Sequence, residues 1–438
     1  MNRNEIDASY QKLWDELSTA LTKKVDLAVV QAPPGSGKTH TLIEVVSRLV
    51  QKGFSVALAA QTNRQADDIA KRWHESHPKL LVIRLGGSKS QPPRDFPSSI
   101  RWETKAKELP RNPGVYISTS AKWSTMRNPD PFDLLAVDEA WQMSWANLMK
   151  CANLSKKFFL IGDPGQIPPV VTIDVRRWQT SPRGPHLPAP EVVLADDELK
   201  SKAFIGSLPA CRRLPNESVR FVKPFYAFDF YSYAQPKERE ITFKGKSLLL
   251  EKMQSGEPVV FTIKSADQGA LVEVDNQISK KIREIVHELM SSAVKIIVDE
   301  NTNSRFLEAR DIGVCATHRS MNGDISQELG PDFQDVIVDT PERWQGLQRP
   351  IMIVVHPLSN VMDPSEFDLE TGRLCVMASR HQVGLIILTR DHVGETLKRF
   401  IPSAGQAPGA PDTVGRGHHA HKSFWAELER AGRITALS

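Results

Sequence analysis

The eight residues from Ala32 to Thr39 constrain this chain more than any other stretch. They read Ala-Pro-Pro-Gly-Ser-Gly-Lys-Thr, follow an apolar run at 27–30 and precede a helix-like segment at 41–50. A strand, a glycine-rich turn and a helix in this order form a P-loop, whose backbone N–H groups point at phosphate oxygens. The pattern normally starts with Gly, and Ala32 is a small departure at a position outside the crowded glycines. The sequence therefore predicts a site for a nucleoside triphosphate.

Individual residues of this loop have separate expected tasks. Lys38 can reach the β- and γ-phosphates, and Thr39 can offer its hydroxyl to Mg²⁺. The residues that we expect to bind ATP here are Pro34, Gly35, Ser36, Gly37, Lys38, Thr39 and His40.

Two carboxylates follow a later apolar run at 132–137. Such a run is typical of a buried parallel strand, which would deliver Asp138 and Glu139 to its carboxyl edge. We expect Asp138 to hold Mg²⁺ and Glu139 to orient and deprotonate the attacking water. The alternative is a strand end before a helix N-terminus that favours acids, and the upstream P-loop weighs against it. A further strand at 158–161 leads to Gln166, whose amide is placed to sense the γ-phosphate.

Bulk properties are those of a soluble globular protein. A length of 438 residues suits two α/β domains, and a net charge of +4 is compatible with a nucleic-acid partner without arguing for one. Four widely separated cysteines make a disulfide framework or zinc site improbable and fit a reducing cytoplasm. No apolar stretch approaches the length of a membrane span, so we expect a cytoplasmic protein without a membrane partner.

Alternating strand and helix patterns predict mostly parallel sheets. In the second half we expect strands at 258–263, 312–316, 336–338, 351–355 and 385–388. The expected organisation is an N-terminal amphipathic helix (1–24), a first domain (25–204), a second domain (205–401) and a Pro/Gly linker with a C-terminal helix (402–438). Residues 74–114 lose the regular pattern, and we interpret them as an insertion from the first sheet.

Three stretches allow two interpretations each. The trio Arg176-Arg177-Trp178 can bind a phosphate and a base, or can be an exposed loop with one anchoring Trp. The aromatic residues of 219–233 can stack on a single strand, although we favour core packing. Three histidines within 418–421 can bind a metal, although we favour a solvated tail.

The motifs of the first half, taken in order, resemble those of superfamily 1 helicases, especially the superfamily 1B group related to the RNA helicase of nonsense-mediated decay. The P-loop and the segments 60–66 and 118–123 look like the first three motifs. The run 138–142 is similar to the family's Asp-Glu-Ala-x-Gln box, and 162–166 looks like its third numbered motif. The resemblance covers residues 27–391.

The second half continues the same order. Segment 208–215 resembles the one that carries a phosphate-sensing arginine, here Arg213, and 312–319 resembles a strand-turn that family members end with Thr-Pro-Tyr. Segment 338–346 looks like the fifth motif, whose Gly-x-Glu ending becomes Gly-x-Gln348 and makes the usual ribose contact less certain. Segment 373–380 resembles the sixth motif, with Arg380 as the arginine finger.

The resemblance implies two tandem RecA-like domains with ATP in the cleft between them. Arg213 and Arg380 would act from the second domain, so hydrolysis would require closure. A single strand would contact the backbone-binding residues Thr62, Asn63, Thr119 and Thr340. Contacts to phosphates carry little sequence information, so we expect weak sequence preference and salt-sensitive binding.

Three functions stay open on the sequence alone. The first is an ATP-dependent helicase or translocase on single-stranded DNA or RNA, with 5′-to-3′ movement suggested by the resemblance. The second is a nucleic-acid-stimulated ATPase that remodels protein–nucleic-acid complexes. The third is a nucleotide-switched binding module with slow turnover, whose C-terminal tail recruits a protein partner. None of them requires an oligomer.

Overall fold

The computed structural model describes residues 1–106, 109, 112–126, 132–171, 174–265, 273–299, 303–402 and 412–437. These residues divide into two compact units. The first comprises Met1–Pro164 and Pro168–Pro209, and the second comprises Gly165–Ile167 and the described chain from Ala210 onward. Among the described residues, no helix has the length and hydrophobicity needed to cross a membrane.

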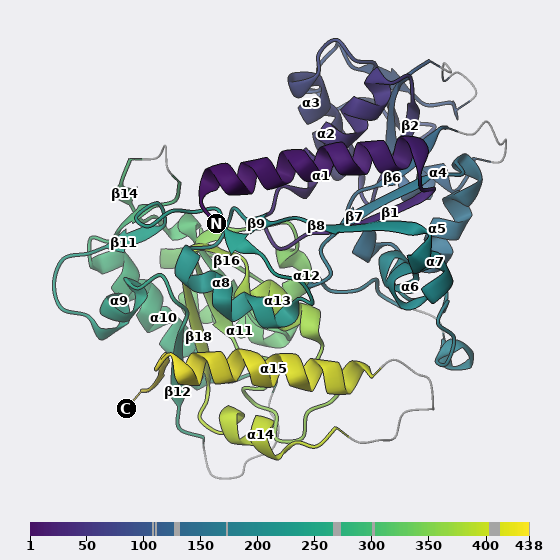
Figure 1. The fold of residues 1–438 in the computed structure, drawn as a ribbon. Coiled ribbons are helices and arrows are strands. Elements are labelled where there is room, and N and C mark those ends of the chain that lie inside the picture. The colour runs from purple at the N-terminus through teal and green to yellow at the C-terminus, as the bar shows by residue number, and fades with distance from the viewer. Residues whose placement is uncertain are drawn as a thin grey trace. The chain divides into compact units, whose positions relative to one another are not determined.

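An eight-stranded sheet with strand order β4-β3-β5-β2-β6-β7-β1-β8 forms the centre of the first unit (Figure 1). Every neighbouring pair in it is parallel. Its strands are β1 (Leu27–Gln31), β2 (Ser55–Ala60), β3 (Val82–Leu85), β4 (Arg101–Glu103), β5 (Gly114–Thr119), β6 (Leu134–Val137), β7 (Phe158–Gly162) and β8 (Ala203–Ser207). Parallel strands bring their carboxyl ends to one edge, where open α/β sheets bind ligands.

Helices of the first unit begin at recognisable caps. α1 opens with a capping box between Asn2 and Glu5, and α3 opens with one between Thr62 and Gln65. The helices are α1 (Arg3–Lys23), α2 (Lys38–Gln51), α3 (Asn63–Ser76), α4 (Ser120–Trp123), α5 (Trp145–Cys151), α6 (Ala189–Ala195) and α7 (Asp197–Ser201), with 3₁₀ turns η2 (Ala140–Gln142), η3 (Ala152–Leu154) and η4 (Arg176–Trp178).

The second unit contains a six-stranded parallel sheet with the order β16-β15-β17-β18-β12-β19. Two small sheets, β10-β9 and the antiparallel β11-β13-β14, accompany it. The strands are β9 (Ala210–Cys211), β10 (Tyr231–Ser232), β11 (Glu240–Thr242), β12 (Val259–Ile263), β13 (Lys295–Ile297), β14 (Arg305–Phe306), β15 (Ile312–Cys315), β16 (Ile337–Asp339), β17 (Arg349–Val355), β18 (His381–Arg390) and β19 (Ile434–Ala436).

Both faces of this sheet are buried, because alternate residues of its strands enter two different cores. On β17, Met352 and Val354 join one cluster, whereas Ile351 and Ile353 join the other. The helices that cover the faces are α8 (Asn216–Val222), α9 (Leu248–Met253), α10 (Asn276–Ser291), α11 (Arg319–Leu329), α12 (Pro341–Trp344), α13 (Thr371–Ala378), α14 (Val393–Arg399) and α15 (Thr413–Arg430). The prediction of an α/β chain with mostly parallel sheets is confirmed, with one large parallel sheet in each unit.

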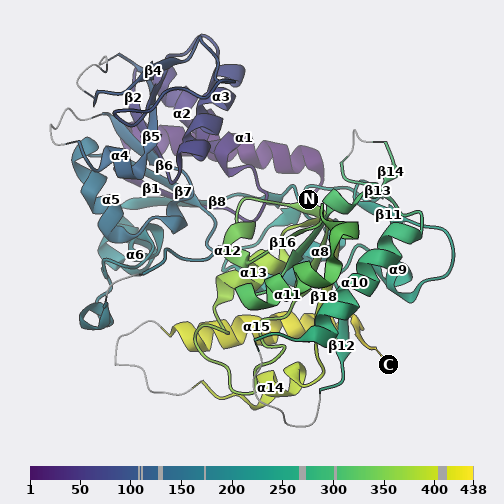
Figure 2. The ribbon, with the colours of Figure 1, turned by 180° about the vertical axis from the view of Figure 1, so that it is seen from behind.

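Two expectations about irregular segments are wrong. Residues 74–114 are not an insertion from the sheet, because they supply β3 and β4 to its edge. The C-terminal histidines do not form a solvated tail, since His418 and His421 lie on α15 and are 8% and 0% exposed. Phe424 belongs to the hydrophobic core of the second unit, and α15 lies beside α13 and α14 in the two opposite views (Figures 1 and 2).

Candidate functional site

The predicted P-loop connects β1 to α2 at the carboxyl edge of the first sheet. Gly35 and Gly37 have φ angles of +65° and +79°, which only glycine adopts without strain. Gly37 is the N-cap of α2, so the loop runs directly into a helix N-terminus. That arrangement is a general site for anions.

Lys38, the first residue of α2, lies between two carboxylates that follow strands of the sheet. Its Nζ atom is 3.4 Å from Oε1 of Glu139 and 3.9 Å from Oδ2 of Asp163, and its side chain is 11% exposed. The Glu139 side chain is 18% exposed. β1, β6 and β7 are neighbours in the sheet, so their carboxyl ends bring this cluster together.

Asp138 and Thr39 meet across 99 residues of sequence. The hydroxyl of Thr39 donates to Oδ2 of Asp138 at 3.1 Å, and Asp138 is 5% exposed. Burial raises the pKa of Asp138 to about 7, the neighbouring charge of Glu139 adds to the rise, and Lys38 opposes it. A hydroxyl and a buried carboxylate are hard oxygen ligands of the kind that Mg²⁺ takes, and a cation there would favour the ionised carboxylate.

Glu139 has an unusual backbone. Its φ angle of +50° places a non-glycine residue in the left-handed region, where strain persists only if the surroundings enforce it. Its N–H donates to Oδ1 of Asp138 at 3.0 Å, which ties the two acids into one turn before η2. The residues present fit ATP and Mg²⁺, because a loop of amides, a cation and two oxygen ligands lie at one sheet edge.

The three threonines predicted to contact nucleic acid share one role, since each is the N-cap of a helix that follows a strand. Thr62 caps α3 and Thr119 caps α4, and their hydroxyls accept from the N–H groups of Gln65 and Lys122 at 3.2 Å. Thr340 caps α12 without a side-chain hydrogen bond and is 8% exposed. The hydroxyls of Thr62 and Thr119 are therefore already engaged within the protein.

Asn63 differs from these threonines because its side chain is exposed and oriented by a buried arginine. Nη2 of Arg84 donates to Oδ1 of Asn63 at 3.0 Å, while Nε of Arg84 donates to Asp67 at 2.8 Å. Arg84 is 1% exposed and stacks over Trp102. The Arg84 bond engages the Asn63 oxygen and leaves the NH₂ group of this exposed residue as its remaining donor. Sequence reasoning missed Arg84, because a single Arg within a strand carries no local signal.

In the second unit, three residues singled out from the sequence lie together. Nε of Arg213 donates to Oε1 of Gln348 at 2.8 Å, and Nη1 of Arg213 donates to the carbonyl of Ser379 at 3.0 Å. Arg380 is 2% exposed, and its Nε has no hydrogen-bond partner among the described residues. A buried guanidinium with an unused donor suits an anionic ligand.

Gln166 follows β7 in sequence but clusters with the second unit. Its backbone packs against Gly372 of α13, where an added Cβ would approach the Gln166 carbonyl to 2.7 Å. The next carbonyl, that of Ile167, accepts from Gln345 at 3.4 Å. The glycine at 372 thus lets the predicted phosphate-sensing segment lie against the helix that precedes Arg380.

A pocket of about 220 Å³ lies at the carboxyl ends of β15 and β17, and sequence reasoning did not predict it. Polar residues after each strand, Thr317 and His318 after β15 and Asn360 after β17, were the available signal. Among the residues that the structure describes, three carboxylates and no lysine or arginine line it. The acids are Glu273, Asp363 and Asp368.

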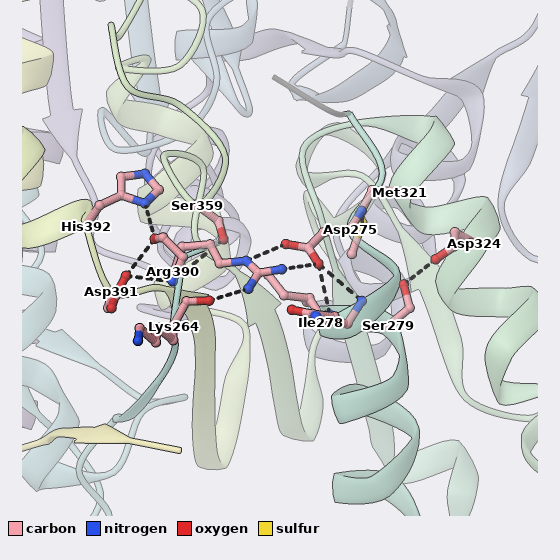
Figure 3. A network of polar contacts seen from close by, with 12 residues as sticks. Lys264, Asp275, Ile278, Ser279, Met321, Asp324, Ser359, Arg390, Asp391 and His392 are labelled. Carbon is pink, nitrogen blue, oxygen red and sulfur yellow. Dashed lines mark hydrogen bonds and ion pairs between the residues drawn. The ribbon is translucent and has the colours of Figure 1, made fainter. Parts of the chain in front are cut away.

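Beside this pocket, a buried ion pair fixes the ends of several elements (Figure 3). Arg390, the last residue of β18, donates through Nε and Nη2 to the two oxygens of Asp275 at 2.8 and 2.7 Å. Asp275 also caps α10, and Nη1 of Arg390 donates to the carbonyl of Lys264 at 2.6 Å. The bidentate geometry is the strong form of this interaction.

The stretches with two interpretations are now distinguishable in part. Phe221, Phe225 and Phe230 lie in the hydrophobic core, which supports the packing interpretation for them. Arg177 stacks over Trp178 at 3.7 Å on the exposed η4 turn. Among the described residues, no group of three or more histidine, cysteine or acidic side chains has the geometry of a metal site.

Comparison with known proteins finds similarity to an AAA domain and to helicases. A family model described as an AAA domain matches residues 16–172. The DNA replication ATP-dependent helicase/nuclease dna2 of Schizosaccharomyces pombe is 22% identical over 408 residues, covering 87% of this chain and 28% of that protein. The DNA polymerase alpha-associated DNA helicase A of the same organism is 34% identical over 94 residues, covering 22% of this chain and 13% of that protein.

Among solved structures, the chain is similar to the arterivirus nonstructural protein 10 helicase. The identity is 14%, the TM-score is 0.45, and the match covers 85% of this chain and 62% of that chain. The chain thus spans less than a third of the length of the two S. pombe relatives. The ordered motifs, the parallel sheets and the sequence matches make this chain similar to superfamily 1 helicases.

Proposed function

We propose that this chain is an ATP-dependent helicase or translocase that couples ATP hydrolysis to movement on single-stranded DNA or RNA, from 5′ to 3′. The observation that carries this proposal is the cluster of Lys38, Asp138 and Glu139 with Thr39 at one sheet edge. Phosphoryl transfer needs a lysine at the P-loop, a pair of oxygen ligands for Mg²⁺ and a base for the attacking water.

Each residue of the cluster has a distinct proposed task. When bound, Mg²⁺ and ATP supply the cation and the transferable phosphoryl group. Lys38 would balance the charge of the phosphate chain, and Thr39 with Asp138 would hold the cation. Glu139 would accept the proton of the attacking water, and its present contact with Lys38 would be exchanged for that water.

The second unit would supply arginine side chains to the same nucleotide. We propose that Arg213 and Arg380 stabilise the transferring phosphoryl, that Gln166 senses it and that Gln348 contacts the ribose. Support comes from the unused Nε donor of buried Arg380 and from the bond between Arg213 and Gln348. An arginine in this role contributes on the order of 10³–10⁵ in rate in well-studied NTPases. We further propose residues 25–204 and 205–401 as the two functional domains.

Single-stranded nucleic acid would cross both domains. Because the hydroxyls of Thr62 and Thr119 cap helices, we propose that these residues act through helix N-termini, whereas Asn63 donates from its side chain. Thr340 would contribute from the second domain. The acidic pocket there suits base edges or sugar hydroxyls better than phosphates, since its described lining has three carboxylates and no lysine or arginine.

Several broader expectations are also proposals. A reducing cytoplasm is supported by four buried free cysteines, Cys151, Cys211, Cys315 and Cys375. A protein partner for the C-terminal segment would have to use the exposed face of α15, which carries Arg416, His419 and Lys422. An oligomer is not required by any residue assigned above.

Strand displacement tests this function. A duplex with a 5′ single-stranded tail should be unwound in the presence of ATP and Mg²⁺, while the same duplex with a 3′ tail should not. ATP hydrolysis stimulated by single strands without displacement of either duplex would contradict the helicase assignment. That outcome would favour an ATPase that remodels protein–nucleic-acid complexes.

A further inference from the structure

Tyr10 connects the N-terminal helix to the phosphate-binding loop. It lies on the buried face of α1, and its hydroxyl donates to the backbone carbonyl of Ser36 at 2.7 Å. Tyr10 is 3% exposed and Ser36 is 1% exposed. A hydrogen bond shielded from water in this way fixes its acceptor firmly.

Other contacts hold α1 in place without this bond. Nε1 of Trp14 donates to the hydroxyl of Thr41 at 3.2 Å, and the guanidinium of Arg48 lies 5.2 Å from the centre of the Trp14 ring. Ile6, Leu17 and Leu21 of the same helix are fully buried. Loss of the Tyr10 hydroxyl alone would therefore leave the helix docked.

The orientation of one peptide unit follows from the Tyr10 bond. The Ser36–Gly37 peptide is planar and trans, so its C=O and N–H point in opposite directions. Because the carbonyl points at Tyr10, the Gly37 N–H points to the other side, and no described residue accepts from it. In a P-loop, the amides of this turn face the phosphates.

Without a partner, this peptide would turn easily. Gly37 tolerates both signs of φ, so rotation of the Ser36–Gly37 peptide meets little steric resistance. We propose that Tyr10 is a positioning residue, whose hydroxyl holds this peptide so that the Gly37 N–H is presented to the β- and γ-phosphates of ATP. The inference rests on the ATP site proposed above, and it assigns to α1 a role beyond packing.

Tyr10→Phe tests the inference, because it keeps the ring and removes only the hydroxyl. By titration calorimetry with Mg²⁺, we expect the affinities for ATP and for inorganic pyrophosphate to fall by the same factor, about 3- to 10-fold for one hydrogen bond. KM for ATP should rise by that factor while kcat stays within about twofold, since an amide that holds the phosphates throughout the reaction binds uniformly.

Tyr116→Phe is the matched control. The Tyr116 hydroxyl also donates to a backbone carbonyl, that of Asn112 at 2.8 Å, in the same unit but away from the loop. Both affinities should stay unchanged in that variant. Trp14→Phe loosens α1 without touching Ser36, so it shows how much a mere structural change contributes if Tyr10→Phe proves unstable.

Three results would overturn the inference. They are unchanged affinities in Tyr10→Phe, a loss for ATP but not for pyrophosphate, and an equal loss of pyrophosphate affinity in Trp14→Phe. Failure of the wild-type protein to bind either ligand would instead contradict the proposed ATP site. The two failures are therefore distinguishable in one set of titrations.

Discussion

At the scale of single residues, the two neighbouring acids have different surroundings. Asp138 is nearly inaccessible and hydrogen-bonded to Thr39, whereas Glu139 turns out of the strand through a left-handed backbone and reaches Lys38. These different environments suit the roles proposed for the two carboxylates, a cation ligand for Asp138 and a base for Glu139. The strain at Glu139 is consistent with a position selected for chemistry.

Glu139→Gln should abolish turnover and retain ATP binding. The amide preserves shape but cannot accept a proton, so kcat should fall by about 10²–10⁴ while the Kd for ATP stays within about twofold. Single-turnover hydrolysis and titration calorimetry measure the two quantities. Glu284→Gln, an exposed position paired with Lys281, is the control and should change neither. Full activity of Glu139→Gln would remove Glu139 from the mechanism.

Site residues carried by short contiguous motifs could be predicted from the sequence, because a glycine-rich turn and a strand-ending acid pair have local signatures. Arg84 could not be predicted, because its role depends on hydrogen bonds to Asn63 and Asp67 that only the fold brings together. Thr62 was predicted to contact nucleic acid, and the capping box that engages its hydroxyl could not be foreseen from that motif alone. Competing local hydrogen bonds decide such cases.

At the scale of secondary-structure elements, β17 and α15 meet through histidines. His356 follows β17, is 1% exposed, and lies edge-on to His421 and Trp425 of α15 with ring centres 5.7 Å apart in both pairs. Nδ1 of His356 accepts the N–H of Leu358. Burial, with a smaller effect of the His392 charge, lowers the pKa of His356 to about 3.

Acidification should therefore destabilise the second unit. The unfolded chain binds a proton at His356 near pH 6.5 and the folded chain does not, so the stabilisation is complete above pH 6.5 and is lost as the pH falls toward 3. At pH 5, protonation of this one group in the unfolded chain lowers the free energy of unfolding by about 2 kcal/mol relative to neutral pH. Urea unfolding of His356→Gln between pH 5 and 8 should show a shallower pH dependence.

His419→Gln is the control for this pH dependence, because His419 is exposed on the same α15 helix. Its pH profile should match that of the wild type. Identical profiles for His356→Gln and the wild type would show that His356 is not the titrating group.

Regular elements were predicted well where the strands are buried on both faces. The expected strands at 258–263, 312–316, 351–355 and 385–388 overlap β12, β15, β17 and β18, because continuous apolar runs are typical of parallel strands. β4 has one exposed and two half-buried residues, so no continuous apolar run predicts it. α15 was predicted only as a C-terminal helix somewhere within 402–438, since Gly and His obscure its first turns, which a cap at Asp412 and tertiary packing stabilise.

At the scale of the whole molecule, the residues proposed to act on ATP are divided between the two units. The first holds the P-loop and the acid pair, and the second holds the arginines and Gln166. The sequence placed Gln166 in the first domain, at 25–204, whereas Gly165–Ile167 cluster with the second unit.

Arg380→Ala should lower kcat for ATP by about 10³-fold or more while ATP binding persists, because the arginine is proposed to act on charge that develops during transfer. Steady-state hydrolysis and equilibrium binding separate the two effects. Arg399→Ala removes an exposed arginine paired with Glu395 and should be neutral. A normal rate in Arg380→Ala would mean that the second unit contributes no arginine finger.

We propose that single-stranded nucleic acid stimulates ATP turnover in this chain. The most direct measurement is the ATP hydrolysis rate of the purified chain without polymer, with single-stranded DNA and with single-stranded RNA, in parallel and at two salt concentrations. We predict stimulation by at least one polymer, which weakens as salt rises because phosphate contacts release counterions. Equal rates in all three reactions would contradict the claim that this protein is a nucleic-acid motor.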